Sequence, residues 1–297
     1  MIDSLKNEFE IQDTVKVTSG NNGMPKVILT HNSGSSTEVY LHGAHVTSWK
    51  SSKGEELFFL SRESVFAPNE PIRGGIPIAF PQFSKQGPLK QHGIARTTNW
   101  ELVETGVDAA GTVSAVLKLT DSEETLSQWP HKFAISLRLD LSESSLGVSS
   151  IVENTGDDPF DFQIAFHTYF KVGDIKQTSV CGLEGIPFID TLCDNKRVIE
   201  NHPIKDIDRN VDRIYDKTPD KLSIEDKANN RIIRLEKEDM PDVVVWNPWI
   251  EKAKQVADFG DDEYLQMICV ETACILPAVE LVSGAIWNGK TVFTVAE

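Results

Sequence analysis

Two residues in separate motifs have side chains suited to proton transfer. His167 lies in the motif F-H-T-Y-F, and Glu271 ends the apolar run M-I-C-V-E. An imidazole can hold or release a proton at cellular pH, as a general acid must. A carboxylate at the end of an apolar strand loses hydration, which raises its pKa toward that of a useful base. A structural histidine bonded to a neighbouring strand, and a glutamate that emerges into solvent, remain the alternatives.

Two loops contain candidate ligand-binding residues. The segment P-I-R-G-G-I-P places Arg73 beside two glycines, which could allow a ligand to approach closely. The segment Q-H-G-I-A-R places Gln91, His92 and Arg96 within six residues. This mixture suits hydrogen bonds to sugar hydroxyls and bidentate contact with a phosphate or carboxylate. Either segment could instead be an ordinary polar turn.

Aromatic residues and the lack of cofactor motifs narrow the chemistry. Trp246 and Trp249 in V-V-W-N-P-W could stack on sugar rings or fill the core. We find no G-x-G-x-x-G after a strand, no P-loop and no histidine metal cluster beyond a chance pair at His42 and His45. The cysteines form no C-x-x-C pair and have no histidine at zinc-site spacing, so we expect reduced thiols, no metal and no cofactor. They are Cys181, Cys193, Cys269 and Cys274.

Alternating apolar and polar residues indicate the strands that must position these groups. The clearest alternation covers 133–141, and a second covers 160–170, where His167 falls on the face opposite the phenylalanines. A short helix is predicted at 121–129, with Asp121 as its cap and Glu124 at the reciprocal position. Further strands are predicted at 26–30, 38–41, 56–60, 113–119, 243–246 and 266–270, and a hairpin at 221–225 and 231–235. Many short strands with little helix favour an all-β sandwich in one continuous unit.

The overall charge excludes several classes of partner. The formal net charge is -16 and the isoelectric point is near 4.9. Nucleic acids and anionic membranes require clustered basic charge, so we expect neither as a partner. A small anion remains compatible, because a few local arginines can outweigh a distant field that salt screens. The acidic N-terminus has no signal or transit character and no apolar run could span a membrane, so a cytoplasmic protein is expected.

Taken in order, the motifs resemble those of a known family. P-I-R-G-G-I-P, F-P-Q-F, Q-H-G-I-A-R, F-H-T-Y-F, V-V-W-N-P-W and M-I-C-V-E are similar to the glucose-6-phosphate 1-epimerases, which are hexose-6-phosphate mutarotases of the galactose mutarotase-like superfamily. The early L-H-G-A-H-V-T-S-W also fits. The resemblance covers roughly residues 25–290, and so many ordered motifs are highly specific together. It implies an all-β β-supersandwich, here a single domain over 1–297.

The resemblance also implies roles for individual residues. His167 would protonate the ring oxygen of a hexose 6-phosphate, and Glu271 would take the proton of the anomeric hydroxyl. Arg73, Gln91, His92 and Arg96 match positions that contact substrate, with the arginines as phosphate holders. Asp212, in N-V-D-R-I-Y, matches an acidic sugar-binding position. One departure is that some relatives follow the basic glutamate with Pro-Gly, where this chain has T-A-C.

The expected activity is therefore the interconversion of α and β anomers by an isomerase that needs no cofactor and acts as a monomer on a small sugar phosphate. Such mutarotation moves only protons, so a histidine and a carboxylate suffice. A non-catalytic carbohydrate-binding or regulatory protein on the same fold is the first alternative. A glycoside hydrolase is the second, and it would require two carboxylates flanking the scissile bond.

Overall fold

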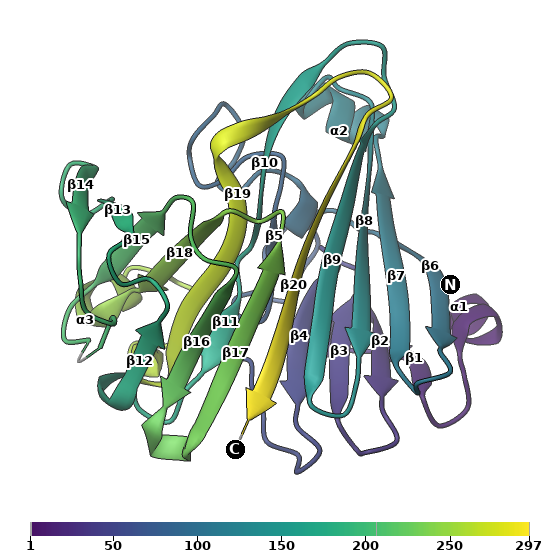
Figure 1. Cartoon of the computed structure of the whole chain (residues 1–297). Coiled ribbons are helices and arrows are strands. Elements are labelled where there is room, and N and C mark those ends of the chain that lie inside the picture. Colours follow the sequence, from purple (N-terminus) through teal and green to yellow (C-terminus); the bar gives the residue numbers. More distant parts are fainter. Residues whose placement is uncertain (1, 206, 297) are drawn as a thin grey trace.

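The strands of this computed structural model, which describes residues 2–205 and 207–296, form three antiparallel sheets (Figure 1). The N-terminal sheet has the order β1-β2-β3-β4. The site sheet has the order β14-β13-β15-β18-β19-β10-β5, with β11 also paired to β19, and the long sheet has the order β12-β16-β17-β20-β9-β8-β7-β6. Figure 1 shows the long sheet in front of the other two. The predicted β-sandwich class is confirmed.

The strands differ widely in length, and β19 is the longest of those described. The site-sheet strands are β5 (Ile78–Ala79), β10 (Phe160–Phe166), β11 (Tyr169–Lys171), β13 (Pro187–Asp190), β14 (Lys196–Ile199), β15 (Val211–Tyr215), β18 (Asp242–Asn247) and β19 (Met267–Leu281). The long-sheet strands are β6 (Glu101–Val107), β7 (Val113–Thr120), β8 (Phe133–Leu141), β9 (Ser145–Asn154), β12 (Thr178–Cys181), β16 (Lys221–Asp226), β17 (Arg231–Glu238) and β20 (Ile286–Ala296). The N-terminal sheet contains β1 (Val15–Ser19), β2 (Pro25–Thr30), β3 (Ser36–Tyr40) and β4 (His45–Lys50).

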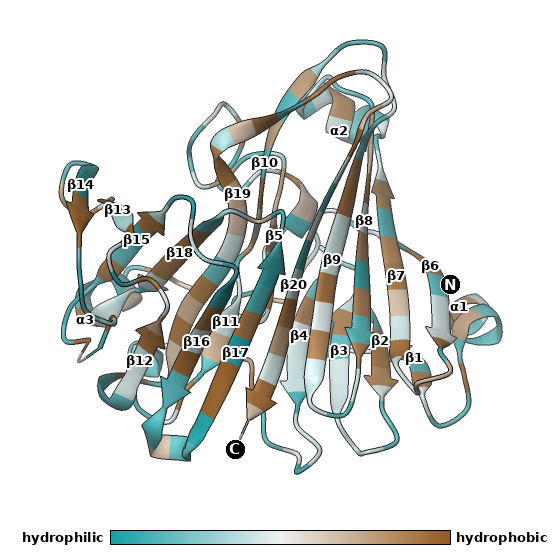
Figure 2. Cartoon of the chain, in the orientation of Figure 1, coloured by the Kyte–Doolittle hydropathy of each residue, from teal (hydrophilic) through white to brown (hydrophobic). Residues whose placement is uncertain are grey.

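One hydrophobic cluster joins the three sheets. Val27 of β2, Ile135 of β8 and Val270 of β19 all belong to it and are fully buried. The cause is the period-two pattern, which sends every second side chain of a strand to one face. Figure 2 shows this as brown and teal bands along β8, whose predicted alternation over 133–141 is confirmed. Each large apolar side chain buried in this way contributes roughly 1.5–3 kcal/mol.

Most predicted strands are present within a few residues of their expected bounds. The hairpin is confirmed as β16 and β17, and β2, β3, β7 and β18 match the predicted segments. The strand predicted at 266–270 is present as the start of β19, which continues to Leu281. Residues 56–60 make only isolated bridges, such as Phe58 with Phe170 and Leu60 with Gly74, so a strand there is wrong. The T-A-C segment after Glu271 continues β19 as strand and forms no loop.

The helix prediction was correct in place and wrong in its cap. Helix α2 covers Glu123–Gln128, and Ser122, not Asp121, is the N-cap. The Ser122 hydroxyl accepts a hydrogen bond from the Thr125 amide, and the Thr125 hydroxyl accepts one from the Ser122 amide. Helices α1 (Ile2–Phe9) and α3 (Trp249–Ala253) were not predicted. Of the helices in the described chain, none has the length and apolar character to cross a membrane.

The predicted single strand over 160–170 is interrupted, and the interruption matters for the site. Thr168 donates both its amide (2.7 Å) and its hydroxyl (3.1 Å) to the carbonyl oxygen of Phe166. This tight turn ends β10, and β11 begins at Tyr169. On β19 the partner of Phe166 is Thr272 and the partner of Tyr169 is Cys269. His167 therefore lies in the gap between two strands that both pair with the strand carrying Glu271.

Candidate active site

The strands of the site sheet and two loops enclose a pocket of about 490 Å³. This volume is within the range of small-ligand sites. The lining is mainly polar and aromatic, and it includes six of the seven residues proposed from the sequence as catalytic or substrate-binding: Arg73, Gln91, His92, His167, Asp212 and Glu271. The topology thus brings together residues that lie up to about 200 positions apart, since Arg73 and Glu271 face one cavity.

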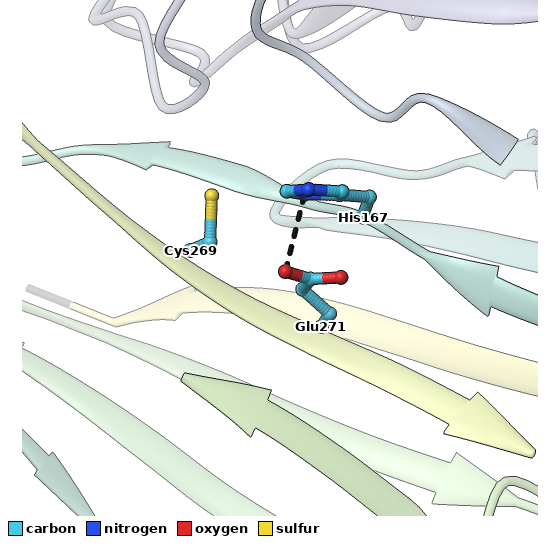
Figure 3. A group of neighbouring side chains, drawn as sticks. All are labelled: His167, Cys269 and Glu271. Carbon is cyan, nitrogen blue, oxygen red and sulfur yellow. Dashed lines mark ion pairs between the residues drawn. The ribbon is translucent and has the colours of Figure 1, made fainter. Parts of the chain in front are cut away.

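His167 and Glu271 meet inside this pocket (Figure 3). Nδ1 of His167 lies 3.2 Å from Oε1 of Glu271, and their side chains are only 10% and 2% exposed. The contact does not have the alignment of a hydrogen bond, so Nδ1 of His167 has no hydrogen-bond partner among the described residues. Oε2 of Glu271 has none among them either. Buried polar atoms without partners are costly, and this makes the pair a candidate for chemistry.

Burial sets the protonation of the pair. It lowers the pKa of His167 well below its ordinary value, and the neighbouring His92, Arg96 and Arg73 lower it further. Burial raises the pKa of Glu271 well above its ordinary value, with a smaller contribution from Asp212. Both directions favour a neutral imidazole beside a carboxylic acid over an ion pair. The pair then has one proton that can move between the carboxyl group and the imidazole, as an acid and a base that act together require.

Arg73 enters the pocket from an irregular segment in which two glycines are needed because neighbouring backbone packs against them. Gly74 and Gly75 have φ of 116° and 60°. A Cβ on Gly75 would lie 1.9 Å from the carbonyl oxygen of Val46, and one on Gly74 would lie 2.4 Å from that of Phe59. The expectation that these glycines admit a ligand is therefore wrong, because they admit neighbouring backbone.

The Arg73 guanidinium is held by two side chains. Nε donates to Asp258 (3.1 Å) and Nη1 donates to the hydroxyl of Tyr169 (3.0 Å). Burial acts to lower the pKa of Arg73, but Tyr169 and Asp258 outweigh it and raise that pKa. Burial also raises the pKa of Tyr169, so its phenol stays protonated. The ring of Tyr169 is stacked on His167 at 4.9 Å with planes 8° apart, which connects the arginine to the pair of His167 and Glu271.

His92 forms a second wall of the pocket. Its ring lies edge-on to His167, with centroids 5.1 Å apart, and its Nδ1 accepts a hydrogen bond from the Ser84 amide (3.2 Å). Burial lowers the pKa of His92 well below its ordinary value, and the charges of Arg96 and Arg73 add to this effect. A neutral His92 therefore has Nε2–H as its donor.

Comparison with known proteins decides the family. The family model described as aldose 1-epimerase matches residues 25–294. The chain belongs to the aldose 1-epimerase family. It is 41% identical over 275 residues to a Cenchrus ciliaris protein named "Putative glucose-6-phosphate 1-epimerase", covering 90% of this chain and 84% of that one. An Escherichia coli (strain K12) protein of the same name is 38% identical over 236 residues, covering 78% of each.

Solved structures support the same assignment. The crystal structure of a "putative mutarotase" from Salmonella typhimurium superposes with a TM-score of 0.89 at 28% identity, covering 97% of this chain and 96% of that chain. The predicted galactose mutarotase-like fold is thereby confirmed. Membership of the aldose 1-epimerase family supports an isomerase and disfavours the glycoside hydrolase alternative.

One predicted substrate residue of this epimerase family member lies outside the pocket lining. Arg96 follows the loop that carries Gln91 and His92, and its Nη2 donates to the Gln91 carbonyl oxygen (2.7 Å). Its buried Nε has no partner among the described residues. Burial and the charge of Arg73 lower the pKa of Arg96 to about 10. Its role as a phosphate holder stays a prediction.

Several pocket residues of the epimerase were missed or misjudged from the sequence. Lys85 and Lys252 line the pocket and are exposed, but exposed lysines carry no distinguishing signal in a sequence. Trp246 lines it too, whereas Trp249 packs on Tyr264 with centroids 5.0 Å apart. Asp212 of β15 is half-buried at the rim, and burial raises its pKa.

The histidines of the early L-H-G-A-H motif hold the segment that carries Arg73. His42 Nε2 donates to the carbonyl oxygen of Glu70 (2.8 Å), and His45 Nε2 donates to that of Gly74 (2.7 Å). Burial lowers the pKa of His45 to about 3, so its imidazole stays neutral. Both rings anchor the backbone just before and after Arg73. Their only sequence signal was their place in a family motif.

Proposed function

We propose that this protein interconverts the α and β anomers of a hexose 6-phosphate, with glucose 6-phosphate as the first candidate. The observation that carries the proposal is the contact of His167 with Glu271, 3.2 Å apart, in a cation-lined pocket. The names of the two curated relatives support the same substrate class. One domain, with the three sheets around a shared core, would provide the whole site.

The phosphate is proposed from local charge. Arg73, Lys85 and Lys252 line the pocket of a chain whose net charge is -16. Asp258 neutralises part of the positive charge of Arg73. The exposed Lys85 and Lys252 therefore supply the rest of the positive charge that would face a phosphate. A phosphate dianion would gain charge-assisted hydrogen bonds from these groups. An unphosphorylated sugar would leave them to solvent, which makes them the source of the preference for a sugar phosphate.

Ring opening requires two proton transfers. Glu271, as carboxylate, takes the proton of the anomeric hydroxyl while the bond between the anomeric carbon and the ring oxygen breaks. His167, as imidazolium, donates a proton to that ring oxygen, which yields the open-chain aldehyde. Because Nδ1 of His167 faces Glu271, Nε2 is the nitrogen proposed to reach the sugar. Rotation about the bond between the first two carbons exposes the other face, and reclosure reverses both transfers.

The single proton of the pair fits this cycle. A neutral imidazole beside a carboxylic acid has the same number of protons as an imidazolium beside a carboxylate. When Nε2 of His167 carries the imidazole proton, transfer of the Glu271 proton to the bare Nδ1 gives the form that starts ring opening. Sugar hydroxyls in the pocket would solvate the charged form that burial disfavours. Matched, shared acid and base groups of this kind contribute about 10²- to 10⁴-fold each.

The test is the relaxation of pure α-glucose 6-phosphate followed by polarimetry or NMR. We expect the wild type to accelerate it over the spontaneous rate, and His167→Ala and Glu271→Gln to lose the acceleration. Matched controls are His202→Ala and Glu251→Gln, which change exposed residues outside the pocket. If the wild type binds the sugar without accelerating its relaxation, the non-catalytic carbohydrate-binding alternative holds instead.

The phosphate requires a separate comparison. Initial rates with glucose 6-phosphate and with glucose are measured for the wild type and for Lys85→Ala, Lys252→Ala and Arg73→Ala. We expect the variants to lose preference for the phosphorylated sugar by about 10-fold, as for a charge-assisted hydrogen bond. A preference that is the same in all four proteins would remove these cations from phosphate recognition.

A further inference from the structure

A third chemically reactive side chain faces the catalytic pair. Cys269 and Glu271 are two positions apart on β19 and therefore point to the same face of the strand. Figure 3 shows both directed toward the His167 ring, which crosses above them. One ligand atom from each of the three residues lies within 4.8 Å of the others. All three residues are buried, and Cys269 is fully so.

The unmet hydrogen-bonding capacity of this group points to a ligand. Nδ1 of His167 and Oε2 of Glu271 are buried without hydrogen-bond partners in the described chain. Tyr169 stacks on one face of the imidazole, and Trp246 lies edge-on at 6.2 Å. The ring is thereby fixed with Nδ1 toward the carboxylate. A cation would satisfy the orphaned nitrogen and oxygen together.

We propose that His167, Cys269 and Glu271 form an inhibitory binding site for a thiophilic divalent cation, with Zn²⁺ as the prime candidate. Imidazole, thiolate and carboxylate are the three ligand types that zinc accepts, and the thiolate disfavours Mg²⁺ and Ca²⁺. No other cluster of three or more such side chains was found among residues 2–205 and 207–296.

The geometry needs only a small adjustment. Zinc bonds of ~2.0–2.3 Å in a tetrahedron place ligand atoms ~3.4–3.7 Å apart. The distance between Nδ1 of His167 and Oε1 of Glu271, 3.2 Å, is already close to this value. The other separations, up to 4.8 Å, close by a shift of ~1 Å in the sulfur or the ring. Three protein ligands leave a fourth position open, and His167 and Glu271 both line the pocket, so that position faces the space proposed for the sugar.

Binding has a direct consequence for catalysis. A cation on Nδ1 of His167 and on the Glu271 carboxylate occupies the proton-transfer groups, so bound metal and turnover exclude each other. Cation binding itself does not depend on the proposed activity. The cysteine is not among the pocket-lining residues, so it reaches the cation from behind the pair.

The experiment measures metal binding on the chelator-treated full chain. The background carries Cys181→Ser and Cys193→Ser, because Cys193 is exposed and Cys181 half-buried. Cd²⁺ is titrated as the spectroscopic probe, with thiolate-to-cadmium absorption as the signal, and Zn²⁺ competition gives its affinity. We expect one equivalent to bind in this background and in the matched control Cys274→Ala, a buried cysteine of the same strand outside the cluster.

In Cys269→Ala we expect loss of the thiolate absorption and at least ~10-fold weaker Zn²⁺ binding. Cys269→Ser, checked for folding by circular dichroism, gives a second variant that keeps the side-chain size. Retained absorption in folded Cys269→Ala or Cys269→Ser, or no binding by the background protein, would overturn the proposal. In the anomer assay Zn²⁺ should inhibit competitively with the sugar phosphate, and the chelator should restore the rate. If no anomer activity exists, the spectral titration still decides the metal site.

Discussion

Two buried groups of ionisable residues in this protein are built in opposite ways. At the corner between β16 and β17, the carboxylate of Asp226 accepts hydrogen bonds from the Asn229 side chain (2.7 Å), Arg231 Nε (3.1 Å) and the Gly173 amide (3.2 Å). Arg231 Nη2 also donates to the Lys171 carbonyl oxygen (2.6 Å). In the pocket, His167 and Glu271 are equally buried but retain polar atoms without partners.

The difference separates a structural from a functional use of buried polarity. The Asp226 corner ties the long sheet to β11 of the site sheet, since Lys171 ends that strand. A buried network in which every polar group has a hydrogen-bond partner is rigid and has one preferred arrangement. The pocket pair keeps an energetic cost in the folded protein, and this cost is recovered only when a ligand or a proton transfer uses the free positions.

The largest expected effect is on turnover by the pocket pair. His167→Ala and Glu271→Gln should each lower kcat by about 10²- to 10⁴-fold, because each removes one partner of a coupled proton exchange. The double variant should be within ~10-fold of the slower single variant, since residues acting as a unit are not additive. Single-turnover NMR of all four proteins checks this. Additive losses would show that the two groups act independently.

At the satisfied corner the expected effect is on stability. Asp226→Ala should lower the free energy of unfolding by about 3–5 kcal/mol, because it leaves the buried Arg231 guanidinium without its carboxylate. The anomer rate per folded molecule should not change. Urea unfolding measures the loss, and Asp161→Ala, at an exposed aspartate of β10, should remain within about 0.5 kcal/mol of wild type. A loss below about 1 kcal/mol would remove the distinction between the two regions.

The pocket should show the opposite response in stability. The raised pKa of Glu271 means that its contribution to stability is full below its unfolded value of 4.5 and is lost as pH rises toward its folded value. Glu271→Gln removes this loss, so the stability of the variant relative to wild type should increase as the pH rises from 4.5 to 8. Thermal unfolding across this pH range checks the sign. A variant that is less stable at pH 8 than at pH 4.5, relative to wild type, would contradict it.

Asp212 is intermediate in burial, and it tests whether a residue at the pocket rim binds the substrate without taking part in proton transfer. It is half-buried at the pocket rim, and burial raises its pKa less decisively than that of Glu271 because its side chain remains near solvent. Asp212→Asn should raise KM for glucose 6-phosphate by roughly 2- to 10-fold with little change in kcat, the signature of uniform substrate binding. Steady-state polarimetry separates the two constants. A dominant fall in kcat would place Asp212 with the catalytic pair.

Alternation predicted much of the fold because it reports burial directly. The strands β7 and β8 and the β16–β17 hairpin were located from their periodicity. The expected continuous strand over 160–170 failed because a local turn at Thr168 outweighed the pattern. Residues 56–60 failed because an apolar run can be buried through isolated bridges without joining a ladder.

For the site, ordered motifs named six residues of the pocket, yet the spacing between them carried no information on distance. Lys85 and Lys252 could not be singled out, since exposed lysines are common and only the tertiary fold brings a loop residue and a residue of helix α3 to one pocket. Cys269 was predicted to be a reduced thiol because no histidine lies at zinc-site spacing from it. Its histidine neighbour, His167, comes from the turn between β10 and β11, about 100 positions away in the chain.

The sequence by itself determined the strand faces, the sandwich class and the chemical character of His167 and Glu271, because these follow from side-chain type and period-two order. Only the tertiary structure decided that the two groups meet, that burial shifts their pKa values in opposite directions, and that Cys269 joins them. Those properties depend on strand pairing and on desolvation, which act between residues that are distant in the chain.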